Sequence, residues 1–373
     1  MEVTVEAMGK LIATLDRNIE ERDLGKPFFR DPRYSRSFPF SKERFRPITP
    51  TDSDRMFVFV DGGNQEILGA PNFSVQMNRV YFSAFKGQKR ILDNSLPDRI
   101  DFFSAVHSCF RKGKLFYDTS VVPLASEFED LLPDEADLSF DSFDRTVMVG
   151  LQRADVSRIA GIARKFAEWE YAFHLVQKEM EKGDVLVLDG TLQTTYTNEF
   201  RYAKKLYQAA KAKNVIVTGL SKTSRLFTTT GLSLLGAVSK FASDHEIPYN
   251  AWALPVAEVT STDHNAFIFV VKLSDMANHI FRFEIYREQY KNMKPEIVNE
   301  ILSQLAENAR DVSFPGYPYG LINADRFARV SGEDAEGYQV LLLSEISKKG
   351  RWPKFARHIR ATDAHNILNM LMG

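Results

Sequence analysis

The chain has 373 residues, of which 44% are apolar and 26% are charged, and this composition excludes global disorder. Its 48 Lys and Arg residues nearly balance 49 Asp and Glu residues, which excludes a uniformly basic nucleic-acid coat. One cysteine excludes an intrachain disulfide and a multi-cysteine zinc site. No apolar run reaches about 18 residues and the N-terminus lacks a signal-peptide pattern, so we expect a cytoplasmic protein with no membrane contact.

The first 50 residues predict a helix followed by an irregular arm. Residues 4–22 carry apolar side chains at helical spacing, with a charged outer face. Residues 26–47 mix aromatic side chains with Lys and Arg and contain four prolines, so regular structure is not expected there. Such a mixture suits single-stranded nucleic acid, and it equally suits an arm whose Phe residues fill surface grooves.

The next part of the chain predicts an antiparallel meander. An apolar run, Met56–Val60, is typical of a buried strand, and residues 74–85 and 113–123 are further strand candidates. Residues 127–144 are acidic, and we interpret an insertion at about 125–145 as a solvated, mobile loop without chemistry of its own.

From residue 150 the pattern changes to alternating helices and strands. Helix 150–182, strand 185–192, helix 199–212 and strand 214–222 predict parallel pairing with crossovers. Helices at 226–242 and 293–309 and strands at 249–255, 266–272 and 280–286 follow. The expected class is α/β, with a core domain at 51–335 and a helical C-terminal extension at 336–373.

Two aspartates stand at apparent strand ends. Asp61 and Asp189 each follow an apolar run and precede a glycine. Carboxylates at neighbouring strand ends can hold a divalent cation, and a following glycine permits a tight turn and close approach of an anionic substrate. For one such Asp-Gly pair a purely structural turn is the better interpretation, but the repetition favours a site.

A metal site for phosphoryl transfer requires further carboxylates. The helix before Asp189 offers Glu168 and Glu170, which point about 200° apart because they are two residues apart on a helix. At most one of them can face the site, and Arg164 lies on the same helix face as Glu168.

Three later residues are weaker candidates. Lys222 does not belong to a P-loop, because Ser221 precedes it and the required earlier glycine is absent, but it can contact a phosphate as a point charge. Tyr317 and Asp325 flank a turn into a helix, where the tyrosine can position a phosphate and the aspartate can ligate a metal. A packed tyrosine and a helix-surface aspartate are the alternative.

The order of these pieces resembles the NurA nuclease family over residues 55–335. Four stretches carry the resemblance: FVDGGN at 59–64, LVLDGTL at 186–192, VTGLSK at 217–222 and GYPYGLINAD at 316–325. Arg164 and Glu168 fit the family's helix between the first two stretches. The resemblance implies an RNase H-like mixed sheet flanked by helices, and Mn²⁺- or Mg²⁺-dependent cleavage of DNA.

Family members are similar in activity and partners. They act as single-strand endonucleases and as 5′–3′ exonucleases on single- and double-stranded DNA. They form homodimers that dock on a HerA-type hexameric ATPase that translocates DNA, and together they resect DNA ends for recombinational repair. The resemblance therefore implies DNA, a HerA-type ATPase and a second copy of the chain as partners. The arm at 26–47 and the basic segment 348–360 are candidates for guiding the strand or contacting the ATPase.

The resemblance also implies roles for individual residues. Asp61, Glu168 and Asp189 would hold the metal, with Glu170 competing with Glu168, while Tyr317 would position the substrate and Lys222 would stabilise developing charge. The family usually has His eight residues after that tyrosine, where this chain has Asp325. Aspartate ligates the same hard cations but cannot act as a neutral imidazole or as a general acid near pH 7. Asp325 is thus the expected fourth ligand.

Three other functions remain compatible with these residues. One is another RNase H-like phosphotransferase, such as a transposase or integrase core. The second is an inactive or catalytically weak adaptor that retains the nuclease fold to bind an ATPase ring, which the Asp325 departure favours. The third is an α/β protein that binds a sugar or nucleotide and whose Asp-Gly turns are structural.

Overall fold

The computed structural model describes residues 2–18 and 23–359. Contacts within the chain divide it into two units, which we call the large and the small unit. The large unit comprises Asp54–Asp189, Gln193–Val217 and the residues from Tyr319 onward, and the small unit comprises the residues up to Ser53, Gly190–Leu192 and Thr218–Pro318. Within the described residues, no helix is long and apolar enough to cross a membrane.

The large unit is built on a mixed sheet. Its strand order is β10-β4-β5-β7-β8-β9, with β6 paired to β5. The pair β10–β4 is parallel, and the other pairs are antiparallel. The strand bounds are Phe57–Ala70 (β4), Phe73–Lys86 (β5), Lys89–Ile91 (β6), Arg99–Arg111 (β7), Lys114–Pro123 (β8), Ser139–Asp141 (β9) and Val185–Asp189 (β10).

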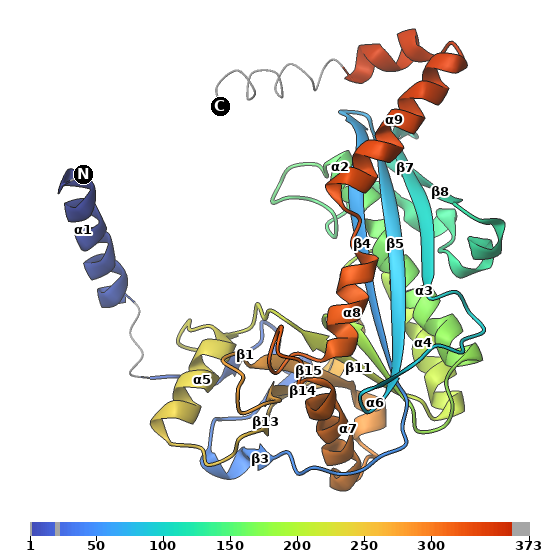
Figure 1. Cartoon of the computed structure of the whole chain (residues 1–373). Helices are drawn as coiled ribbons and strands as arrows, with labels where there is room; N and C mark the ends of the chain where they lie inside the picture. Colours follow the sequence, from blue (N-terminus) through green and yellow to red (C-terminus); the bar gives the residue numbers. More distant parts are fainter. Residues whose placement is uncertain (1, 19–22, 360–373) are drawn as a thin grey trace. The chain divides into compact units, whose positions relative to one another are not determined.

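Helices cover this sheet. Both α3 and α8 contact β4 and β5 (Figure 1). Fully buried aromatic side chains fill the interior, among them Phe59, Phe82 and Phe102 on the strands and Trp169 on α3. The helix bounds are Val156–Ala160 (α2), Ile162–Lys178 (α3), Glu199–Lys213 (α4), Tyr319–Ala328 (α8) and Gly332–Lys348 (α9).

The small unit contains an antiparallel sheet of its own, with strand order β2-β13-β14-β15-β11 and with β3 paired to β13. Strand β11 (Ile216–Ser221) begins in the large unit and ends in the small one. The other strands are Pro27–Phe28 (β1), Ser35–Ser37 (β2), Arg46–Pro47 (β3), Phe227–Thr228 (β12), Trp252–Thr260 (β13), Asn265–Lys272 (β14) and Phe281–Tyr286 (β15). The helices are Glu2–Asn18 (α1), Leu234–Asp244 (α5), Arg287–Tyr290 (α6) and Pro295–Asn308 (α7).

Several predicted elements change in the structure. The predicted helix 150–182 is two helices, with α3 beginning after Gly161, and the predicted helix 226–242 begins only at Leu234. Strand β7 was not predicted, although it lies between two predicted strands of the meander. Residues 19–22 of the first predicted helix and residues 360–373 of the predicted C-terminal extension lie outside the described residues.

The acidic insertion is not a solvated loop. It forms two short 3-10 helices, η3 (Ser126–Leu131) and η4 (Glu135–Leu138), followed by β9. Leu131, Leu138 and Phe140 are buried, and the buried carboxylate of Asp137 pairs with Arg201 and accepts a hydrogen bond from Tyr202. The polar contacts of Asp137 therefore hold the segment to α4, and its apolar residues are buried although the run is acidic.

The arm at 26–47 packs several of its aromatic side chains within the small unit, while Phe28 and Tyr34 are exposed. Phe45 is buried against Trp252, with ring centroids 4.8 Å apart, and Phe38 lies 5.7 Å from Phe267. The guanidinium groups of Arg36 and Arg44 lie 5.6 and 5.3 Å from the Phe38 ring. This packing favours the interpretation of the arm as one whose Phe residues fill grooves.

Candidate metal centre

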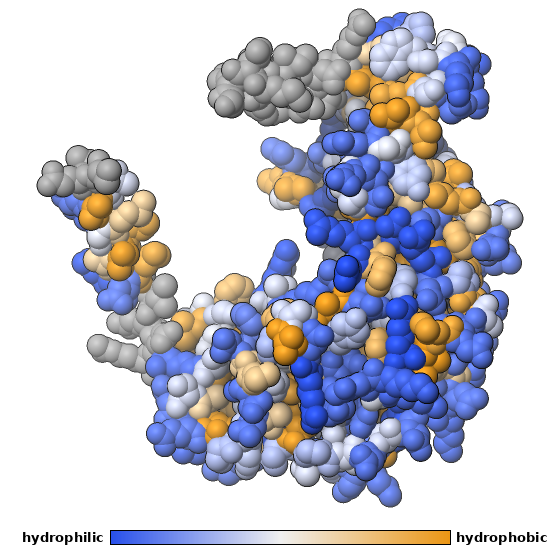
Figure 2. Space-filling model, viewed as in Figure 1, coloured by the Kyte–Doolittle hydropathy of each residue, from blue (hydrophilic) through white to orange (hydrophobic). Residues whose placement is uncertain are grey.

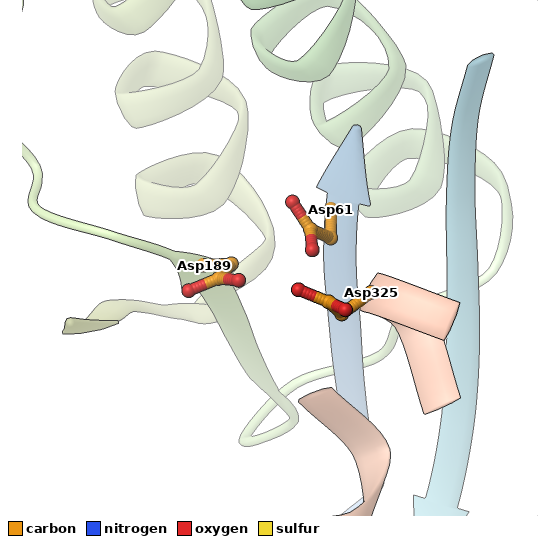
Figure 3. A group of neighbouring side chains, drawn as sticks. All are labelled: Asp61, Asp189 and Asp325. Atoms are coloured by element: carbon orange, nitrogen blue, oxygen red, sulfur yellow. The ribbon is translucent and has the colours of Figure 1, made fainter. Parts of the chain in front are cut away.

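Three carboxylates of the large unit converge in one place. Asp61 lies on β4, Asp189 at the end of β10 and Asp325 on α8, and Figure 3 shows their side chains pointing toward one another. One carboxylate oxygen from each lies within 4.8 Å of the others. Asp61 and Asp189 are partly buried and Asp325 is exposed. Three hard oxygen donors at this spacing fit a divalent cation such as Mg²⁺ or Mn²⁺.

Asp61 lies in the middle of a strand, which corrects the prediction that the strand ends there. Strand β4 continues through Gly62 and Gly63 to Ala70, paired with β5 on both sides of an irregularity between Glu66 and Leu68. The two glycines make room for helices instead of a turn. A Cβ atom on Gly62 would lie 2.6 Å from the Glu168 carboxylate on α3, and one on Gly63 would collide with the Ala328 carbonyl at the end of α8.

The alternation of side chains along β4 explains where Asp61 points. Gly63 faces α8, and so does Phe59, whose ring packs on Gly320 of that helix. Because side chains two residues apart share a face of a strand, Asp61 also faces α8. Asp325 of α8 is therefore delivered to the same face of the sheet.

Asp189 meets Asp61 through parallel pairing. Leu188 of β10 is paired with Val60 of β4, so the two aspartates that follow lie side by side. Strand β10 ends at Asp189, and Gly190 adopts a φ of 114°, a conformation that residues with a Cβ rarely adopt. A glycine-dependent turn was predicted after each aspartate. The prediction is confirmed after Asp189 and wrong after Asp61.

Glu168 lies on the other face of β4, beside Gly62, and does not join the group of three oxygens. Its carboxylate pairs with Arg164, as the spacing of four residues predicts, and accepts a 2.8 Å hydrogen bond from Lys165. Burial lowers the pKa of Lys165, but the Glu168 carboxylate outweighs it, so the net shift is upward. The metal-ligand role of Glu168 stays a prediction.

Arg164 ties this part of α3 to β4. It donates hydrogen bonds of 3.0 Å to the carbonyl of Gly62 and to the side chain of Asn64. Sequence reasoning missed Lys165 and Asn64, although the spacing of three residues between Lys165 and Glu168 was a usable signal.

Glu170 points to a different part of the large unit, as its 200° separation from Glu168 requires. It pairs with Lys205 of α4 and lies 3.2 Å from His174. Burial raises the pKa of Glu170, but the hydrogen bonds with His174 and Lys205 lower it by more, so the carboxylate is held ionised. This engagement with α4 favours Glu168 over Glu170 as the residue nearer to Asp61.

Lys222 and Tyr317 belong to the small unit. Tyr317 is 1% exposed and packs on Phe281 and Phe314, with ring centroids 5.1 and 5.3 Å apart. The Lys222 ammonium lies 5.5 Å from the Tyr317 ring centroid. Their predicted roles toward substrate remain predictions.

The NurA domain is recognised over residues 55–330. No curated protein matches the chain. Among solved structures, the NurA nuclease from Sulfolobus solfataricus is similar, with 13% identity and a TM-score of 0.49 over 93% of this chain and 96% of that one. Endonuclease V from Ciona intestinalis has 12% identity and a TM-score of 0.35, over 74% of this chain and 89% of that one. Drosophila Piwi has 10% identity and a TM-score of 0.25, over 74% of this chain and 29% of that one. Because the NurA domain covers well over half of its residues, the chain belongs to the NurA nuclease family.

Proposed function

We propose that this protein is a metal-dependent deoxyribonuclease whose cation is held by Asp61, Asp189 and Asp325. The observation that carries the proposal is the set of three carboxylate oxygens within 4.8 Å of one another. Membership of the NurA family supports it independently. A bound Mn²⁺ or Mg²⁺ would polarise the scissile phosphate and activate water for in-line attack.

The chain's own residues supply the rest of the site. Asp61 and Asp189 stand on two paired strands, so the separation of their carboxylates is fixed by the sheet. Arg164 and Lys165 neutralise Glu168. Because Glu168 lies on the other face of β4, its proposed role as a further metal ligand would require this segment to rearrange. Tyr317 and Lys222 are proposed to position substrate and stabilise charge.

The substrates, pathway and partners follow from the family. We propose single-stranded DNA and duplex ends as substrates, in end resection and homologous recombination with a HerA-type ATPase, and a homodimeric enzyme. One side of α1 presents Val5, Met8, Leu11, Ile12 and Leu15, all at least 50% exposed, and Figure 2 shows this hydrophobic side. An exposed apolar stripe of this kind supports association with a second chain.

The first test is cleavage of end-labelled single-stranded DNA with Mn²⁺, with Mg²⁺ and with EDTA. We expect metal-dependent cleavage that Asp189→Ala abolishes. The matched control is Asp93→Ala, an exposed carboxylate in the loop after β6. Normal cleavage by Asp189→Ala would show that the metal site is wrongly assigned.

The second candidate is the weak or inactive adaptor, which the presence of Asp325 instead of histidine favours. A folded protein that binds a HerA-type ATPase but cleaves no DNA with any metal, alone or in the complex, would establish it. Cleavage only in the complex would instead establish an enzyme that depends on its partner. Sedimentation velocity tests the homodimer, and Leu11→Glu is expected to shift it toward monomer.

A further inference from the structure

A row of three residues crosses the large-unit sheet beneath the end of α8. Gly63 of β4 is paired with Arg79 of β5, and Arg79 is paired with Asp101 of β7. Arg79 and Asp101 are 8% and 5% exposed. The Arg79 Nε–H donates to Asp101 Oδ1 over 2.8 Å and an Nη2–H to Oδ2 over 3.4 Å, so the guanidinium has a fixed orientation.

A third donor of Arg79 holds the chain at the end of α8. Its Nη1–H donates to the carbonyl oxygen of Arg329 over 3.0 Å, directly after the helix ends at Ala328. A buried cation at a helix C-terminus satisfies a carbonyl that has no partner within the helix and opposes the negative end of the dipole. Gly63 leaves the neighbouring Ala328 carbonyl room to approach the sheet.

This contact reaches Asp325 through one turn of helix. The Arg329 N–H donates to the Asp325 carbonyl over 3.0 Å, so the residue that Arg79 holds is bonded to the residue that bears the carboxylate. Arg79 also lies 3.6 Å from the carboxylate of Asp334, which caps the first turn of α9. The Arg79 guanidinium thereby fixes the junction between α8 and α9 as well.

We propose that Arg79, oriented by Asp101, is a positioning residue that sets where Asp325 stands relative to Asp61 and Asp189. The inference rests on the proposed metal site, since a position matters only if the three carboxylates share a ligand. Asp325 comes from a helix and the other two ligands from the sheet, so a dedicated anchor must fix their relative placement. Gly320 packed on Phe59 and the 3.0 Å bond from Ser83 to the Gly320 carbonyl fix the other end of α8.

The test measures Mn²⁺ affinity by calorimetry, without DNA and without turnover. Arg79→Ala should weaken binding roughly 10- to 100-fold, which is typical for loss of a residue that orients a metal ligand. Arg79→Lys keeps a cation and should recover part of the affinity. Arg111→Ala is the control, because its pair with Asp118 joins β7 to β8 and not to α8.

A double-mutant comparison separates positioning from general stability. If Arg79 acts through Asp325, Arg79→Ala should weaken Mn²⁺ binding no further in an Asp325→Ala background. An equal loss in both backgrounds would overturn the proposal, as would a wild-type affinity in Arg79→Ala. If Arg79→Ala does not fold, Asp101→Asn replaces it, because this substitution preserves the shape of the side chain. Its effect on Mn²⁺ affinity is then compared in the wild-type and Asp325→Ala backgrounds.

The outcomes also distinguish this proposal from the proposed function. Absence of Mn²⁺ binding in the wild-type protein would overturn the metal site itself. Weakened binding in Asp325→Ala with unchanged binding in both Arg79→Ala and Asp101→Asn would leave the metal site intact and refute the role of Arg79.

Discussion

The two units of the chain gather acidic side chains in opposite ways. In the large unit, Asp61, Asp189 and Asp325 bring three like charges within 4.8 Å of one another. In the small unit, Glu284 is fully buried, accepts a 2.6 Å bond from Arg282 and a 2.8 Å bond from the Leu192 N–H, and lies 3.1 Å from His264. Like charges at this spacing repel one another, whereas each member of a buried network of opposite charges compensates its partner, so that removing one destabilises the fold.

This difference distinguishes a group of residues suited to binding, in the large unit, from a structural network in the small unit. The carboxylates of the large unit bring three like charges together, and a bound divalent cation would offset their repulsion, so they are suited to binding. Glu284 has its cation and its donors built in, and it fastens the Gly190–Leu192 turn that directly follows Asp189. Substitutions in the two regions should therefore affect different properties.

The largest expected effect is on cleavage. Asp61→Asn should lower the rate by roughly 10³-fold or more, because metal-held charge stabilisation contributes several kcal/mol to the transition state. The melting temperature should stay the same or rise, since one like charge is removed. Single-turnover cleavage measures the rate, and thermal unfolding measures the melting temperature. A large loss of stability would contradict the distinction between the two units.

The next effect is on stability. Glu284→Gln leaves the buried guanidinium of Arg282 without its counter-charge, which should destabilise the protein by about 3 kcal/mol. Urea unfolding measures the change, with Glu336→Gln, an exposed carboxylate on α9, as the control. An unchanged free energy of unfolding would show that the buried network is not stabilising.

Acid should weaken the same network. Burial raises the pKa of Glu284, but Arg282 and His264 outweigh it and lower the pKa to about 2, from an ordinary value of 4.5. Because the pKa is depressed by folding, its stabilisation is complete above pH 4.5 and is lost as pH falls toward 2, by about 3 kcal/mol at most. Between pH 4.5 and 2, the free energy of unfolding should depend less on pH in Glu284→Gln than in the wild type. Parallel pH profiles of the two proteins would contradict the assignment.

A smaller effect concerns the glycine beneath α8. In Gly63→Ala the new methyl group would collide with the Ala328 carbonyl, so the helix end must shift, at a cost of roughly 1–3 kcal/mol. Gly337→Ala is the matched control, because no atom lies within 4 Å of a Cβ there, and it should stabilise α9 by about 0.5–1 kcal/mol. Equal effects of the two substitutions would show that the close approach is unimportant.

The smallest effect should come from Asp325→His, which restores the residue usual in the family. Imidazole also ligates Mn²⁺, so cleavage should stay within about tenfold of the wild-type rate. Because imidazole must be neutral to bind the metal, the variant should lose activity below about pH 6.5 more steeply than the wild type. Rate profiles between pH 5 and 8 measure this, and identical profiles would place residue 325 outside the metal site.

Sequence alone determined much of the architecture. The α/β class, with a mixed sheet flanked by helices, is confirmed, because apolar periodicity indicates which faces are buried. The NurA family is also confirmed, because its stretches recur in the family's order. Asp61 and Asp189 were candidates because they follow apolar runs, and Asp325 was a candidate because it lies eight residues after Tyr317.

Tertiary structure decided which of these residues meet. Gly62 and Gly63 look like a turn, yet they lie within a strand because two helices press against it, and contacts between distant segments leave no local signal. The same holds for Glu170, whose partner Lys205 comes from the neighbouring helix α4, whereas the pair of Lys165 and Glu168 lies within one helix. Arg79 carried no signal at all, because its meaning comes from Asp101 across the sheet and from a carbonyl 250 residues away.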